Sequence, residues 1–259
     1  MAEIPDFPAN VIRYGREEAL AGRVPLRAGP LSATLENGDL RYVKLDGEPV
    51  VLRLYGAIRD RNWDTIEPRF TRYEVRQEAG GFRVEYTAEC VGGEADFAWT
   101  GEITGTADGT IRAVFDGEAR KPFARNRIGW CVLHPMECAG LPAMTETPDG
   151  VVSGAFPDAI MPWQPFFDMR SISHPTRNGG RVTIHFEGDL FEMEDQRNWT
   201  DASFKTYSTP LRVPYPVQLQ AGDRVRQVVT ITARAATRPV AGGEQGVVAA
   251  RIGEPIGRT

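Results

Sequence analysis

The sequence Phe82-Arg83-Val84-Glu85-Tyr86-Thr87-Ala88-Glu89-Cys90 shows most clearly which class of fold this chain adopts. Phe82, Val84, Tyr86, Ala88 and Cys90 alternate with charged or polar residues. Successive side chains of a β-strand point to opposite faces, so this alternation predicts a strand with one buried face and one solvated face.

The same pattern continues on both sides of this strand. Gly92-Gly93 leads to a partner strand at 95–99, and Asp108-Gly109 separates two more strands. Asn37-Gly38 is the strongest hairpin signal, because both residues tolerate the positive φ of a type I′ turn. Turn signals at intervals of about 8–12 residues are typical of a sandwich. We therefore predict an all-β chain that forms a large antiparallel β-sandwich with few or no helices.

The turn signals also indicate how the chain is divided. They continue without a break through residues 26–236, so we predict a single large β-sandwich domain there. Residues 1–25 read as an N-terminal lead-in. Residues 237–259 are rich in Gly, Ala and Pro and read as a tail or linker.

Composition narrows the possible partners. The net charge is −5 and charges of both signs are interleaved, so we expect no nucleic acid partner. No run approaches the roughly 20 apolar residues of a membrane span. The first ten residues do not resemble a secretory signal, and the three cysteines lack Cys-x-x-Cys spacing. We therefore expect a cytoplasmic protein with reduced thiols, and the oligomeric state stays open.

The segment from Glu192 to Tyr207 concentrates the most chemistry. Glu192 and Glu194 share one strand face, and paired carboxylates can divide acid and base roles. Substrate-binding candidates follow them, namely Arg197, Asn198, Trp199 and Lys205. Arginine clamps carboxylates, and tryptophan stacks on sugar rings. The alternative is a structural network of ion pairs and hydrogen bonds.

A shorter relative of this segment occurs at 59–65. It contains Arg59, Asn62 and Trp63, and both segments include the tripeptide Arg-Asn-Trp. Two interpretations are open: the segments line one cleft from two strands, or they are a pair of similar β-corners.

A third candidate lies at 125–137. His134 precedes a proline at the end of an apolar strand, and histidine is the natural general acid/base near neutral pH. Asn126 and Arg127 are the accompanying substrate-binding candidates. The alternative is a buried histidine satisfied by a backbone carbonyl. Three scattered histidines without ligand spacing are a weak case for zinc, and the acidic cluster at 192–195 could bind Ca²⁺ or Mg²⁺ but lacks a recognisable loop pattern, so we assign no metal site. No phosphate loop or dinucleotide motif predicts a cofactor.

Several of these stretches resemble one family. Leu26–Ser32, Ala57–Trp63, Arg125–Gly129 and above all Glu192–Tyr207 are similar to the β-rich N-terminal part of the D-apionate lactonase family. The resemblance implies a protein that opens a lactone of the branched sugar acid apionate. It also implies that a barrel-like α/β region follows in the family. By fold analogy alone, the chain also resembles the supersandwich of galactose mutarotases.

Together these observations favour a carbohydrate-active protein without a nucleotide cofactor. The leading hypothesis is hydrolysis or ring-opening of a sugar lactone, with His134 as acid/base and Glu192 or Glu194 as its partner carboxylate. Arg59, Arg127 and Arg197 would hold substrate oxygens. The alternatives are a non-catalytic carbohydrate-binding sandwich, a sugar mutarotase or epimerase, and a purely structural domain.

Overall fold

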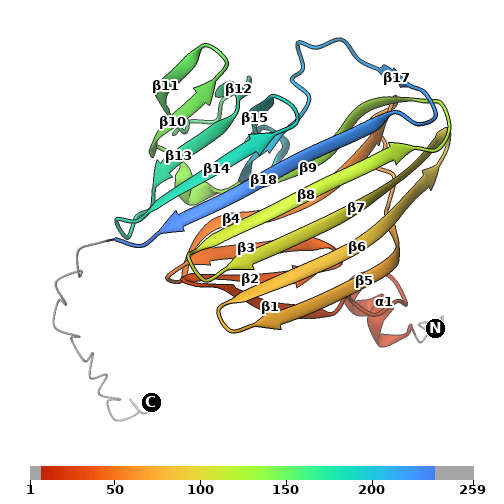
Figure 1. The fold of residues 1–259 in the computed structure, drawn as a ribbon, viewed down its shortest axis with the longest axis horizontal. Coiled ribbons are helices and arrows are strands. Elements are labelled where there is room, and N and C mark those ends of the chain that lie inside the picture. The colour runs from red at the N-terminus through yellow and green to blue at the C-terminus, as the bar shows by residue number, and fades with distance from the viewer. Residues whose placement is uncertain (1–6, 237–259) are drawn as a thin grey trace, which may run out of the picture.

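The computed structural model describes residues 7–236, and these form two antiparallel sheets packed face to face (Figure 1). Each sheet contains nine strands, with one short α-helix, α1 (Ala9–Tyr14), before them. The predicted all-β sandwich is confirmed. Residues 1–6 of the predicted lead-in and the predicted tail at 237–259 lie outside the described residues.

Sheet A has the order β1-β2-β3-β4-β9-β16-β15-β12, and β17 also pairs with β9. Its strands are β1 (Arg23–Ala28), β2 (Leu31–Glu36), β3 (Asp39–Leu45), β4 (Glu48–Asp60), β9 (Phe123–Pro135), β12 (Phe166–Met169), β15 (Phe191–Asp195), β16 (Ser203–Tyr207) and β17 (Val217–Leu219). Two 3₁₀ turns adjoin it, η1 (Met136–Cys138) and η2 (Gln196–Trp199).

Sheet B has the order β11-β10-β13-β14-β18-β8-β7-β6-β5. Its strands are β5 (Arg69–Glu78), β6 (Gly81–Gly92), β7 (Ala95–Thr106), β8 (Thr110–Ala119), β10 (Pro142–Thr147), β11 (Gly150–Ala155), β13 (Ser171–Pro175), β14 (Arg181–Glu187) and β18 (Arg224–Arg234). The alternating run Phe82–Cys90 lies within β6, and its apolar residues are buried as predicted.

The core lies between the two sheets. Trp99 of sheet B stacks on Phe115 at 4.4 Å between ring centroids and meets Trp130 of sheet A edge-on at 5.9 Å. Burying a large apolar side chain stabilises the fold by about 1.5–3 kcal/mol. Sheet A also has an outer face, which does not contact sheet B.

The central strands of sheet A are held in a continuous register. In β4 and β9, Tyr55 lies opposite Cys131 and Arg59 opposite Arg127. In β9 and β16, Cys131 lies opposite Tyr207. Cross-strand partners point to the same face of a sheet, so these side chains gather on one outward surface.

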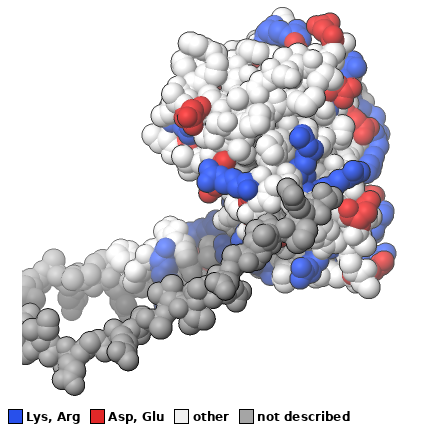
Figure 2. Space-filling model, turned by 90° about the vertical axis from the view of Figure 1, so that its left-hand side faces the viewer, with Lys and Arg blue, Asp and Glu red and all other residues white. Residues whose placement is uncertain are grey.

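The free edges of sheet B differ in charge. β5 carries five Arg and Glu side chains, whereas β11 carries none and all six of its residues are exposed. Figure 2 views the end of the sandwich near β10 and β11, and its upper part shows a broad surface with few charged side chains, which lie toward its edges. Charged side chains and short length both discourage an edge strand from pairing with another strand. β11 is short but carries no charge.

Candidate functional site

A cavity of about 570 Å³ opens on the outer face of sheet A. Strands β4, β9, β15 and β16 supply its floor, and the segments after β4, β15 and β16 supply its walls. The lining residues are Tyr55, Ala57, Arg59, Trp63, Arg127, Gly129, Cys131, Glu194, Gln196, Trp199, Lys205, Tyr207, Ser208 and Leu211. Both Arg-Asn-Trp segments therefore contribute a tryptophan to one cavity.

The alternation of β9 explains why His134 is not among these residues. Arg127, Gly129 and Cys131 face the cavity, so the even-numbered residues, including His134, face the core. The His134 side chain is fully buried and its Nε2 lies 2.8 Å from Thr206 Oγ1. Burial, and then the nearby His174, lower the pKa of His134 to about 3. This position argues against the general acid/base role expected from the sequence, because such a group must reach its substrate.

The two expected catalytic glutamates lie in different environments. Glu194 lines the cavity, where its carboxylate accepts a hydrogen bond from Trp199 Nε1 at 3.2 Å and pairs with Lys205 Nζ at 3.2 Å. Glu192 is 1% exposed. Its Oε1 accepts from Tyr207 Oη at 2.8 Å and from the Leu211 amide at 2.7 Å. Of the two, only Glu194 is placed to touch a ligand.

Arg127 is held at the cavity wall by aromatic and backbone contacts. Its guanidinium carbon lies 3.9 Å from the ring centroid of Tyr207 and 5.3 Å from that of Trp63. It donates a hydrogen bond to the carbonyl of Thr209 and lies 3.9 Å from Glu192 Oε1. Cation–π contacts of this kind hold an arginine in place without neutralising its charge.

The corner after β4 places Arg59 and Trp63 together. Asp60 Oδ1 accepts hydrogen bonds from the amides of Asn62 and Asp64, at 2.8 and 2.9 Å, and closes the turn. Trp63 takes a positive φ of 69°, and its carbonyl accepts a hydrogen bond from Arg59 Nη1 at 2.7 Å. The turn therefore directs the indole toward the cavity, while the Asn62 side chain is exposed and does not line it.

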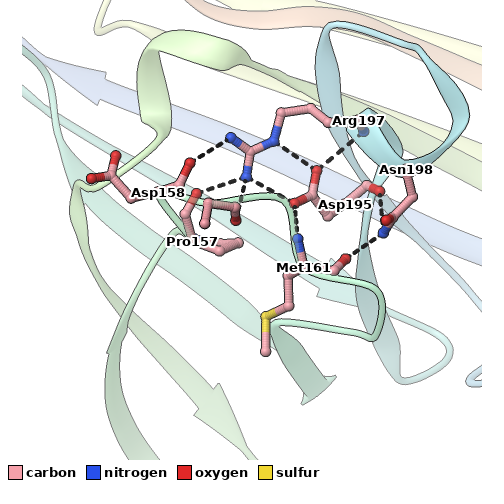
Figure 3. Close-up of polar contacts among 7 residues, drawn as sticks. Pro157, Asp158, Met161, Asp195, Arg197 and Asn198 are labelled. Atoms are coloured by element: carbon pink, nitrogen blue, oxygen red, sulfur yellow. Dashed lines mark hydrogen bonds and ion pairs between the residues drawn. The ribbon is translucent and has the colours of Figure 1, made fainter.

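Arg197 lies in the second segment but performs a different task (Figure 3). Its guanidinium donates to Asp195 and to the carbonyls of Pro157, Asp158 and Ala159, over 2.8–3.1 Å. Burial opposes ionisation of the Asp195 carboxyl, but the hydrogen bonds from Arg197 and Met161 outweigh it and lower the Asp195 pKa. Hydrogen bonding to Asp195 raises the pKa of Arg197.

Two expected binding amides also serve the scaffold. Asn198 Nδ2 donates to the Met161 carbonyl, and so fastens η2 to the same distant segment as Arg197. Asn126 is 4% exposed and donates to the Arg61 carbonyl at 3.1 Å. Neither Arg197, Asn198 nor Asn126 lines the cavity. Their contacts instead fix the two corners that carry Trp199 and Trp63.

Sequence reasoning missed several lining residues, chiefly Tyr55, Cys131, Gln196 and Tyr207. Tyr55 lies four residues before Arg59 on β4, and Tyr207 lies two residues after Lys205 on β16. Residues two or four apart on a strand point to the same face, so this spacing alone places each tyrosine beside a predicted site residue. Burial raises the pKa of Cys131 and of Tyr207, and in Tyr207 the nearby Glu192 acts in the same direction. Both groups are therefore uncharged near neutral pH.

Within residues 7–236, no group of three or more His, Cys, Asp or Glu side chains is arranged to hold a metal ion. In the same part of the chain, no helix has the length and apolar character needed to cross a membrane.

Solved structures place this fold among known sandwiches. Galactose 1-epimerase from Lactobacillus acidophilus superposes with a TM-score of 0.52 at 9% identity, covering 83% of this chain and 94% of that one. An aldose epimerase homologue from C. elegans superposes with a TM-score of 0.51 at 9% identity, covering 83% and 99%. At such low identity the likeness concerns the fold alone, which is the galactose mutarotase-like β-sandwich.

Sequence comparison identifies the family. The profile of the D-apionate lactonase N-terminal domain matches residues 11–236. The D-apionate lactonase of Brucella anthropi is 40% identical over 223 residues, covering 84% of this chain and 36% of that protein. The chain belongs to the D-apionate lactonase family, as its sequence resemblance predicted, and it spans about a third of the length of this relative.

Proposed function

We propose that the cavity on sheet A binds a sugar-acid lactone and opens it by hydrolysis, as the name of the Brucella anthropi relative describes. The observation that carries the proposal is the pairing of Glu194 with Lys205 at 3.2 Å inside a cavity of about 570 Å³ walled by Trp63 and Trp199. A carboxylate can act as a general base, a cation can stabilise an oxyanion, and an indole can stack on the apolar face of a sugar.

The proposed chemistry assigns one task to each group. Hydrolysis adds water to the lactone carbonyl, forms a tetrahedral oxyanion and then releases the ring oxygen. Glu194 takes the proton from the attacking water and returns it to the ring oxygen as the C–O bond breaks, and Lys205 and Arg127 stabilise the oxyanion. Trp63 and Trp199 present flat apolar surfaces to the sugar carbons.

The test compares the purified chain with its Glu194→Gln variant on D-apionolactone and on a panel of aldonolactones. Ring opening is followed by NMR against the uncatalysed rate. Loss of a general base lowers the rate by about 10²–10⁴-fold. Glu187→Gln is the matched control, because Glu187 is exposed and lies on sheet B. A wild-type rate in Glu194→Gln contradicts the assignment of Glu194.

A second candidate function is binding of the sugar without catalysis. It is favoured by the two partners that Glu194 already has, since Lys205 and Trp199 Nε1 occupy lone pairs that a base needs. Saturable binding of lactones without any acceleration of ring opening would establish this alternative.

The mutarotase alternative has less support. Ring-opening epimerisation of an aldose was expected to use a histidine with a carboxylate, and none of the three histidines of the chain lines the cavity. Including free aldoses in the NMR panel tests this reading directly, since a mutarotase would accelerate their anomeric exchange.

A further inference from the structure

Two arginines face each other on the floor and wall of the cavity. Arg59 of β4 and Arg127 of β9 are direct cross-strand partners, and both line the cavity. Like charges directly opposite each other destabilise a sheet. A negative charge near both arginines would offset this repulsion.

The described residues supply only part of that compensation. Lys205 is paired with Glu194 at 3.2 Å, and Arg127 lies 3.9 Å from Glu192. Among residues 7–236, Arg59 has no carboxylate within ion-pair distance, and its one hydrogen bond runs from Nη1 to the Trp63 carbonyl. Three cations thus meet two carboxylates, which leaves an excess of one positive charge.

We propose that Arg59 and Arg127 form a carboxylate subsite that binds the open-chain sugar-acid anion more tightly than the neutral lactone or aldose. This inference rests on the proposed function, because it places the sugar carbons between Trp63 and Trp199. The guanidinium fork matches the two oxygens of a carboxylate, and the free edge of Arg59 is available to it.

A carboxylate fits the charge of the cavity better than a phosphate does. One carboxylate carries a single negative charge, which balances the excess of one positive charge, whereas a phosphate monoester carries about −1.5 to −2 at pH 7. The subsite therefore selects an aldonate rather than a sugar phosphate. In a lactonase, it would retain the product and make the product a competitive inhibitor.

Isothermal titration calorimetry with D-apionate, the neutral sugar D-apiose and inorganic phosphate tests the subsite. Wild-type protein is expected to bind D-apionate at least about tenfold more tightly than D-apiose, with an affinity that falls as salt is added. Equal affinity for the acid and the neutral sugar overturns the proposal. Phosphate binding as tight as D-apionate, without competition from D-apiose, overturns the sugar-acid assignment.

Variants locate the effect. Arg59→Gln is expected to weaken D-apionate binding about tenfold and to weaken D-apiose binding much less, because the neutral sugar has no carboxylate to lose. Arg59→Lys keeps the charge and is expected to fall between Arg59→Gln and wild type. Arg61→Gln is the matched control, because Arg61 lies two residues away, is exposed and does not line the cavity. Equal D-apionate affinity in Arg59→Gln and Arg61→Gln refutes the subsite, provided that both variants melt like wild type.

The two proposals fail separately. D-Apionate binding that depends on Arg59, without lactone hydrolysis, supports the subsite and contradicts the catalytic assignment. Lactone hydrolysis that depends on Glu194, with no preference for D-apionate over D-apiose, supports catalysis and contradicts the subsite.

Discussion

The two Arg-Asn-Trp segments use the same tripeptide in opposite surroundings. In Arg61-Asn62-Trp63 the arginine is exposed, whereas in Arg197-Asn198-Trp199 the arginine side chain is 9% exposed and clamps a loop nearly 40 residues earlier in the chain. In both, an aspartate closes the turn through backbone amides, and the tryptophan lines the cavity. The tripeptide thus makes a corner that directs an indole, and tertiary contacts decide what its arginine does.

The largest expected effect separates the two arginines. Arg197→Met leaves the fully buried Asp195 without its cation, and breaking a buried pair costs about 3–5 kcal/mol. Arg61→Met changes an exposed side chain, and we expect a change within about 0.5 kcal/mol. Urea unfolding measures both. Equal losses would show that the second corner is not fastened more strongly than the first.

His134 is a buried titratable residue next to the second segment: it lies opposite Phe204 of β16 in the sheet. The pKa of His134 is lowered from 6.5 to about 3, so between these pH values the unfolded chain binds a proton that the folded chain excludes. Stability is therefore complete above about pH 6.5 and is lost as the pH falls toward 3. At pH 5 the loss is about 2 kcal/mol.

His134→Gln checks this origin of the pH dependence. Urea unfolding at pH 7.5 and pH 5.0 is expected to show a smaller loss in the variant than in wild type. His174, whose pKa burial also lowers, contributes in the same direction in both proteins. An unchanged loss in His134→Gln would remove His134 from this account.

Replacing either tryptophan is expected to have a smaller effect, of similar size for the two corners. If both corners serve one cavity, Trp63→Ala and Trp199→Ala each weaken sugar binding by about 1 kcal/mol, or roughly fivefold. Their effects on stability differ. Trp63 meets Tyr215 edge-on at 5.3 Å, whereas Trp199 is 71% exposed, so only Trp63→Ala is expected to lower the melting temperature. If one variant binds the sugar as tightly as wild type, the tryptophan it lacks does not contribute to binding, and only the other corner does.

The smallest effect concerns the backbone of the second corner. Thr200 takes a positive φ of 63°, which is unfavourable for a β-branched residue and acceptable for asparagine. Thr200→Asn is therefore expected to raise the free energy of unfolding by about 0.5 kcal/mol. A decrease would show that the hydrogen bond from Thr200 Oγ1 to the Trp199 carbonyl matters more than the strain.

Much of the fold was predictable because its causes are local. The alternation at 82–90 and the turn residues Asn37-Gly38 depend only on neighbours in the chain, and the structure has β6 and the β2–β3 turn at these positions. The site was predictable in part. Arg59, Trp63, Arg127, Glu194, Trp199 and Lys205 line the cavity. These residues lie on outward strand positions or at the corners.

The remaining site predictions depended on contacts that no local pattern contains. Leu133 and His134 are adjacent, and hydrophobicity favours the leucine inside. The register of β9 with β4 and β16 places Leu133 outward and His134 in the core. Glu192 shares its strand face with Glu194, yet the segment around Leu211 covers Glu192 and leaves Glu194 open.

By itself, the sequence determined the class of fold, the family and the residue types available for sugar chemistry. Strand period and turn chemistry are properties of short stretches, so they are readable without a structure. Only the tertiary structure decided which of those residues share a cavity. That choice depends on sheet register and on loops that pack from distant positions, such as residues 157–161 against Asp195 and Arg197. Arg59 and Arg127 lie opposite each other for the same reason, because β4 and β9 are far apart in sequence and become neighbours only in the folded sheet.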